Sequence, residues 1–135
     1  MLRILLADDH QMVRKTLRML LETHVGWQVC GEASNGREAV ELAAKLKPHI
    51  AVLDLEMPNL SGLEATRQIK MESPAVEVII CSMYESNQFV REAFGAGARG
   101  YVLKSEAGQH LMEAVEALSR GESFFTQRRW LSGEF

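Results

Sequence analysis

Short apolar runs alternate five times with amphipathic stretches along the chain. The apolar runs are rich in β-branched residues and nearly continuous in hydrophobicity, which is typical of strands covered on both faces. They predict strands at Arg3–Ala7, Trp27–Glu32, Ile50–Leu53, Val76–Ser82 and Gly100–Leu103. The amphipathic stretches between them are long enough to form helices.

Apolar residues in these stretches recur three and four positions apart, which is the spacing of one helix face. Asn35 stands where it would cap the second helix, and Gly121 where it would end the last one. Strict alternation of strands and helices predicts an α/β fold with a parallel sheet and right-handed crossovers. The apolar positions are Val13, Leu17, Leu20 and Leu21; Val40, Ala43 and Ala44; Val90, Ala93, Phe94 and Gly97; and Leu111, Val115 and Leu118.

Polar side chains stand at the carboxyl ends of four of the five predicted strands. In open parallel sheets, ligands bind beyond these ends, beside the point where the strand order switches. The second strand delivers only Glu32, Ala33 and Ser34, which favours an edge position away from a site. The polar groups at the other strand ends are Asp8 and Asp9, Asp54, Ser82 and Lys104, in chain order.

The three carboxylates of Asp8, Asp9 and Asp54 would repel one another unless a cation lay among them. Oxygen ligands without cysteine or histidine select Mg²⁺, with Mn²⁺ as the alternative, over zinc. A cation, the Lys104 ammonium and the Ser82 hydroxyl around one carboxylate are what a transferring phosphoryl group needs. Asp54 is therefore interpreted as a nucleophile that forms an aspartyl-phosphate.

The loop after Asp54, with the sequence LEMPNLSG, contains Pro58 and Gly62 and precedes a helix. Such a loop can place the backbone carbonyl of Glu56 on the metal. The four histidines share no ligand spacing, and His10, beside the acidic pair, is interpreted as a surface residue rather than a ligand.

The composition describes one ordinary globular domain of 135 residues with a net charge of -3. That charge argues against a nucleic-acid surface, which needs clustered Lys and Arg. Arg14, Lys15 and Arg18 recur at helical spacing and predict a solvated helix face. Cys30 and Cys81 have no C-x-x-C spacing and predict buried, reduced thiols, which suits a cytoplasmic protein. No apolar run approaches the 18 residues of a membrane span.

The segments that end these strands resemble the response-regulator receiver domain of two-component systems. They are ADDH, LDLEMPNLSGLE, ICSMYE and GARGYVLK, and the resemblance covers Leu2 to about Gly121. The details ADDHQMVR, SMYE and GARGYVLK are similar to the LuxR/NarL (FixJ-type) subfamily, whose members carry a C-terminal helix-turn-helix. The resemblance implies a flavodoxin-like (βα)5 three-layer sandwich with a five-stranded parallel sheet of order 2-1-3-4-5. Residues 1–121 are then the receiver domain, and residues 122–135 a linker stub or tail.

The same resemblance implies how the acidic residues act. Asp54 would be the phosphoacceptor. Asp9 would bind Mg²⁺ directly and Asp8 through water, and the backbone carbonyl of Glu56 would complete the protein ligands.

The resemblance also implies a switch. Ser82 would take the Thr/Ser switch position, Tyr101 the aromatic switch position, and Lys104 would pair with the phosphoryl group. Tyr84, like Glu56, would modulate the phosphoryl lifetime. The family often has a cis-proline after the lysine, but this chain has Ser105, which makes a cis bond costly.

The partners implied are a sensor histidine kinase as phosphodonor and a C-terminal DNA-binding output domain in the full-length protein. A homodimer also fits the family. We expect no direct nucleic-acid binding by this chain, no membrane partner, a cytoplasmic location, and no catalysis beyond its own phosphorylation and dephosphorylation.

Three alternatives stay open at this point. A haloacid-dehalogenase-like phosphohydrolase also uses an aspartate nucleophile, but it needs an acidic Asp two positions later, where this chain has Glu56. A flavodoxin-like FMN binder needs a phosphate-cradling loop, whereas DDHQMVRK would repel phosphate. A degenerate receiver would act without phosphorylation, although Asp54 and Lys104 are both intact.

Overall fold

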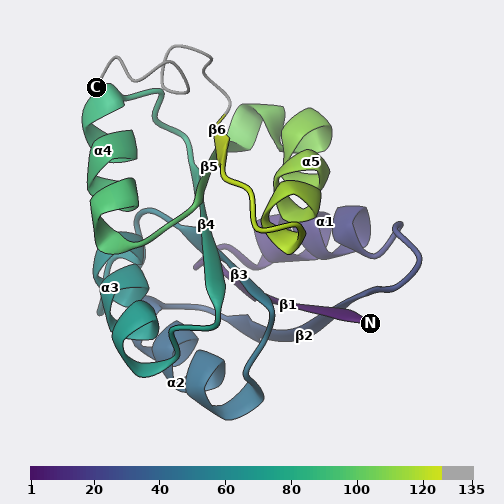
Figure 1. Ribbon diagram of the computed structural model, residues 1–135, viewed down its shortest axis with the longest axis horizontal. Helices are drawn as coiled ribbons and strands as arrows, with labels where there is room; N and C mark the ends of the chain where they lie inside the picture. The colour runs from purple at the N-terminus through teal and green to yellow at the C-terminus, as the bar shows by residue number, and fades with distance from the viewer. Residues whose placement is uncertain (126–135) are drawn as a thin grey trace.

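The computed structural model describes residues 1–125, in which one parallel sheet is covered by helices on both faces (Figure 1). The strands are β1 (Leu2–Ala7), β2 (Trp27–Ala33), β3 (Ile50–Asp54), β4 (Glu77–Ser82), β5 (Gly100–Leu103) and β6 (Phe124–Phe125). The helices are α1 (Gln11–Leu21), α2 (Gly36–Leu46), α3 (Gly62–Glu72), α4 (Asn87–Ala96) and α5 (Ala107–Ser119), with a 3-10 turn, η1 (Lys104–Glu106), before α5.

The sheet has the order β2-β1-β3-β4-β5-β6, and every neighbouring pair is parallel. The flavodoxin-like fold and the predicted order of its first five strands are confirmed, and each predicted strand lies within one residue of the observed bounds. The sixth strand was not predicted. It begins the segment that the sequence suggested was a linker or tail, and residues 126–135 of that segment lie outside the described residues.

Two apolar layers fill the space between the sheet and its helices. On one face α1 and α5 cover the sheet, and on the other face α2, α3 and α4 do so (Figure 1). Alternate residues of each strand enter opposite layers, as Leu5 and Ile80 enter one and Ile4 and Ile79 the other. This two-sided burial explains why the strands are nearly continuous in hydrophobicity.

The predicted helix ends are confirmed where they rest on a named cap. The side chain of Asn35 accepts a hydrogen bond of 2.8 Å from the backbone N–H of Glu38, which satisfies one free donor of α2. Gly121 follows α5 with φ of 81°, a left-handed conformation that glycine adopts without strain. The chain then turns directly into β6.

The strand order places the polar strand ends together. The chain runs from β1 to the edge strand β2 and then returns past β1 to β3. The order therefore switches between β1 and β3, and the residues after β1 lie beside Asp54 at the end of β3.

Both cysteines are free, but they differ in burial. Cys81 on β4 is buried as predicted, and desolvation raises the pKa of its thiol to about 12. Cys30 is only half-buried because β2 is an edge strand, so the prediction of burial was wrong for this residue. Within residues 1–125, none of the helices has the length and apolar character needed to span a membrane.

Candidate phosphorylation site

Two buried carboxylates and one ammonium meet at the carboxyl end of the sheet. Asp8 is 2% exposed and Asp54 7% exposed. The Nζ atom of Lys104, from the end of β5, lies 2.9 Å from Oδ2 of Asp8 and 3.1 Å from Oδ1 of Asp54. The single positive charge of Lys104 therefore offsets part of the two negative charges that the fold buries together.

These contacts act on the pKa values of both partners. Burial, followed by the charge of Asp8, raises the pKa of Asp54, while Lys104 opposes that rise. Burial alone would lower the pKa of Lys104, but hydrogen bonds and charges from Asp8 and Asp54 raise it. Each group therefore favours the charged form of the other: Lys104 favours ionised Asp54, and the two carboxylates favour protonated Lys104.

The turn after β1 orients the acidic pair. Asp8 donates its backbone N–H to the carbonyl of Ala33 at 3.0 Å, and its Oδ1 atom accepts the N–H of His10 at 2.9 Å. Asp9, in contrast, keeps its side chain 31% exposed. One carboxylate is therefore fixed inside the rim, and the next faces the solvent beside it.

The donor set fits a hard divalent cation. Oxygen atoms of Asp8, Asp9 and Asp54 and a ring nitrogen of His10 all lie within 4.8 Å of one another. Three carboxylates in so small a space suit Mg²⁺ or Mn²⁺. His10 is 68% exposed at its side chain, as expected of a surface residue, although its Nδ1 atom lies 3.1 Å from Asp9.

The loop after β3 brings further backbone groups to Asp54. The N–H of Glu56 donates a hydrogen bond to the Asp54 carboxylate and lowers its pKa. Gly62 lies so close that an added Cβ would stand 2.2 Å from the Asp54 carbonyl oxygen. Only glycine fits there, which explains why the loop LEMPNLSG ends in this residue.

Ser82, Tyr84 and Tyr101 form a chain of contacts between β4 and β5. The buried Ser82 hydroxyl accepts the N–H of Tyr84 at 2.9 Å. The Tyr101 hydroxyl donates to the carbonyl of Tyr84 at 2.7 Å, and its ring is fully buried. Burial raises the pKa of Tyr101, while a hydrogen bond with Ser82 lowers it. Hydrogen bonds therefore link all three residues in one chain.

Tyr84 also contacts the loop that follows β3. Its hydroxyl donates to Oε1 of Glu56 at 2.8 Å, and this hydrogen bond is the main reason that the pKa of Tyr84 is raised. Glu56 and Tyr84, which were both expected to modulate the phosphoryl lifetime, therefore contact each other, and the sequence did not indicate this contact.

The peptide bond between Lys104 and Ser105 is trans, like the others in residues 1–125. Lys104 and Ser105 begin the 3-10 turn η1.

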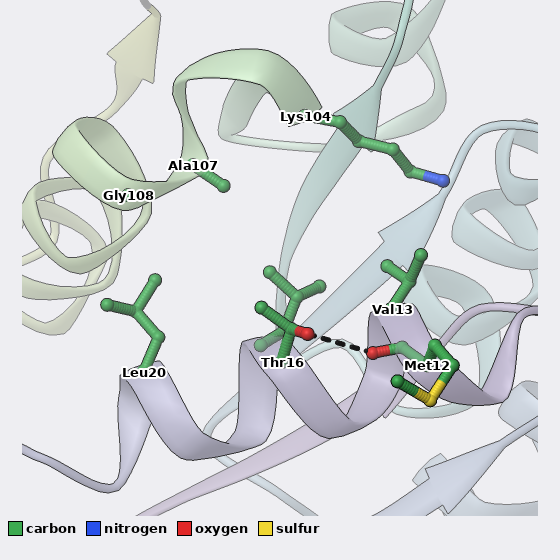
Figure 2. Close-up of a pocket in the computed structure, with 8 residues that line it drawn as sticks. Met12, Val13, Thr16, Leu20, Lys104, Ala107 and Gly108 are labelled. Atoms are coloured by element: carbon green, nitrogen blue, oxygen red, sulfur yellow. Dashed lines mark hydrogen bonds between the residues drawn. The ribbon is translucent and has the colours of Figure 1, made fainter.

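Two hollows lie at this end of the molecule. One of about 290 Å³ has Asp54, Lys104, Ser82 and Tyr84 in its lining and offers room for a phosphoryl group. The other, of about 430 Å³, is an apolar groove between α1 and the start of α5. Figure 2 shows Leu20 on α1 pointing toward Ala107 and Gly108, and Val13 below the extended side chain of Lys104.

The basic cluster on α1 is only in part the solvated face that its spacing predicted. The Nε atom of Arg14 donates to Oε1 of Glu32 at 3.0 Å, and Nη1 of Arg18 donates to Oε2 at 2.7 Å. Lys15 is exposed and the side chain of Arg18 is 44% exposed, as predicted. The prediction was wrong for Arg14, which is 15% exposed, because helical spacing does not tell which strand residue lies opposite.

The comparisons with known proteins agree with this geometry. The sequence profile of the response regulator receiver domain matches residues 4–116. The chain is 41% identical over 119 residues to the transcriptional regulatory protein YdfI of Bacillus subtilis, which covers 88% of this chain and 55% of that protein. It is 37% identical over 124 residues to the response regulator protein VraR of Staphylococcus aureus, covering 92% and 59%. The chain thus spans between half and two thirds of these relatives' lengths.

A solved structure gives the same result. The crystal structure of a LuxR-family two-component response regulator from Aurantimonas sp. SI85-9A1 is 40% identical and superposes with a TM-score of 0.87. The alignment covers 90% of this chain and 87% of that one. The chain belongs to the response regulator receiver domain family, and it is a receiver domain of the LuxR family of two-component response regulators. The phosphohydrolase alternative has no support in these matches.

Proposed function

We propose that this domain accepts a phosphoryl group on Asp54 and responds by changing the surface around Tyr101. The observation that carries the proposal is the position of Asp54, which ends β3 at a cavity, 3.1 Å from Lys104 and within reach of the acidic pair. A carboxylate whose pKa is raised by burial and a neighbouring charge is a candidate reactive group.

In the proposed reaction, a carboxylate oxygen of Asp54 attacks the phosphorus of a phosphohistidine on a sensor kinase. A bond from oxygen to phosphorus forms, and the bond from phosphorus to nitrogen breaks with its electron pair returning to the imidazole. Asp8, Asp9, Asp54 and the Glu56 carbonyl are the proposed Mg²⁺ ligands, with Mn²⁺ as the alternative. The bound cation would supply positive charge beside the transferring oxygens.

Lys104 and Ser82 receive the new group in this proposal. The ammonium already spans Asp8 and Asp54, and it can pair with a phosphoryl oxygen after one of these contacts is given up. Ser82 accepts one hydrogen bond from Tyr84 and can turn its proton toward the phosphoryl group. No other enzymatic activity is proposed for the domain.

The response would travel through Tyr84 to Tyr101. Because the carbonyl of Tyr84 accepts the Tyr101 hydroxyl, a movement of Ser82 that pulls on Tyr84 also acts on the ring. The buried ring seen in the structure is one of the two proposed states, and an outward ring is the other. Exchange between them would reshape the face formed by α4, β5 and α5.

The partners proposed are a sensor histidine kinase, a DNA-binding helix-turn-helix output domain in the full-length protein, and a second copy of the domain. The apolar groove between α1 and α5 opens beside Lys104 and is our candidate contact surface for the kinase (Figure 2). We propose a cytoplasmic location, which suits two free cysteines. The net charge of -3 favours protein partners over nucleic acid for this domain.

The test is incubation with acetyl phosphate and Mg²⁺, followed by intact-mass spectrometry. One phosphoryl group per chain should appear, labile to hydroxylamine, and Asp54→Asn should abolish it. Attachment to Ser82, or release of phosphate over many turnovers as in a phosphohydrolase, would contradict the proposal.

A further inference from the structure

Arg14 contacts the acidic turn as well as Glu32. While its Nε atom donates to Glu32, its Nη1 atom donates to the backbone carbonyl of Asp8 at 2.6 Å. The Arg14 side chain is 15% exposed, so its guanidinium group is largely shielded from water. One guanidinium therefore joins the helix after β1, the end of β2 and the turn that carries both aspartates.

The carbonyl that Arg14 holds belongs to the peptide between Asp8 and Asp9. The N–H of Asp8 is held by Ala33 and its carboxylate by His10 and Lys104. With the carbonyl also held, the plane of the Asp8–Asp9 peptide is fixed, and with it the direction in which the Asp9 side chain leaves the backbone.

A cation at this position is unexpected on electrostatic grounds. Arg14 is in the first half of α1, where the positive end of the helix dipole disfavours a positive charge. It also stands beside the carboxylates that would bind a cation. Glu32 eases both conflicts, because its carboxylate accepts from Arg14 as well as Arg18 and its pKa is lowered, chiefly by Arg18.

We propose that Arg14, paired with Glu32, is a positioning residue that holds the Asp8–Asp9 turn in the geometry needed to bind Mg²⁺. This inference rests on the proposed metal site. Arg14 does not contact the metal in this scheme, and it acts only through the Asp8 carbonyl. Arg18 also donates to Glu32 but makes no hydrogen bond or ion pair with Asp8 in residues 1–125, which makes it a matched control.

The experiment compares Mg²⁺ affinity and thermal stability in the same variants. Mg²⁺ binding is followed by NMR shifts of the backbone amides of Asp8, Asp9 and Asp54. Arg14→Met should weaken Mg²⁺ binding by about tenfold, the lower end of losses seen when groups that orient metal ligands are removed. Arg18→Met should change it by less than about twofold, since Arg18 pairs with Glu22 and Glu32 from a side chain that is 44% exposed, and such exposed pairs contribute little. Both variants should melt at lower temperature than the parent, because each removes a hydrogen bond to Glu32.

Arg14→Lys keeps the experiment decisive if Arg14→Met does not fold. An ammonium lacks the planar fork and cannot reproduce both contacts, so Mg²⁺ binding should again be weaker than in the parent. Parent-like Mg²⁺ affinity in the folded Arg14 variants would overturn the inference, and so would equal losses in the Arg14 and Arg18 variants.

Asp9→Ala separates this inference from the proposed function. If Asp9→Ala loses Mg²⁺ binding and the Arg14 variants keep it, the metal site stands and the role of Arg14 is wrong. If Asp9→Ala binds Mg²⁺ as well as the parent does, the metal site itself is wrong and the inference falls with it.

Discussion

Replacing Lys104 by Met removes the positive charge between two buried carboxylates and keeps the length of the side chain. At about 3 Å and an effective dielectric constant of about 20, each charge pair is worth roughly 5 kcal/mol before desolvation. The lysine side chain is 21% exposed, so little of this is lost to solvent. Removing one partner of a buried ion pair costs about 3–5 kcal/mol of folding stability. We expect Lys104→Met to lose about 3 kcal/mol at pH 7 without Mg²⁺.

The loss should depend on pH in a defined direction. The pKa of Asp54 is already raised in the fold, and removing Lys104 raises it further. A carboxyl group with a raised pKa contributes stability below its unfolded pKa of about 3.9 and loses it as the pH rises through the folded value. The unfolding free energy of Lys104→Met should therefore be close to that of the parent near pH 4 and lower than that of the parent at pH 7.

Urea unfolding at both pH values, with and without Mg²⁺, measures this difference. Mg²⁺ should narrow the gap, because the carboxylates of Lys104→Met lack the lysine charge and attract a cation more strongly than those of the parent. Lys15→Met, which removes an exposed lysine from α1, is the control and should change stability by less than about 0.5 kcal/mol. Equal stability of Lys104→Met and the parent at pH 7 without Mg²⁺ would refute the reasoning.

Four further changes have expected outcomes. Asp54→Asn should raise the melting temperature without Mg²⁺, because the fold disfavours the charge that it removes. Tyr101→Phe should cost about 1 kcal/mol in urea unfolding through the lost bond to the Tyr84 carbonyl. Phe125→Ala should cost about 3 kcal/mol, since the ring is 8% exposed. Glu32 has a lowered pKa, so its contribution to folding stability is lost as the pH falls below about 4.5. Glu32→Gln should be less stable than the parent at pH 7, and its unfolding free energy should change less with pH in the acid range.

The sequence predicted which polar side chains would lie together, because these residues stand at strand ends. Parallel strands bring their carboxyl ends to one edge whatever their exact bounds, so Asp8, Asp54 and Lys104 meet even though the predicted strands differ from the observed ones by a residue. The strand order explains why the acidic turn after β1 adjoins β3. An error of one residue in a predicted strand boundary therefore does not change which side chains lie at this edge of the sheet.

Contacts between side chains of different elements could not be predicted in this way. The spacing of Arg14 and Arg18 describes a helix face, but it does not tell that Glu32 lies across from it. The bond between Tyr84 and Glu56 joins two loops whose paths only the fold determines. The strand at Phe124–Phe125 is two residues long, shorter than any window in which alternation can be recognised.

This short strand has a consequence for how β5 can meet other molecules. Phe124 and Phe125 pair with Gly100 and Tyr101, so this part of β5 is an interior strand. An unpaired edge would invite strand addition from another chain. Because β6 is tethered to β5 through α5, its effective concentration is of the order of millimolar or higher. Any external strand that pairs with Gly100 and Tyr101 must displace this internal one, so association through that part of β5 begins with the release of β6.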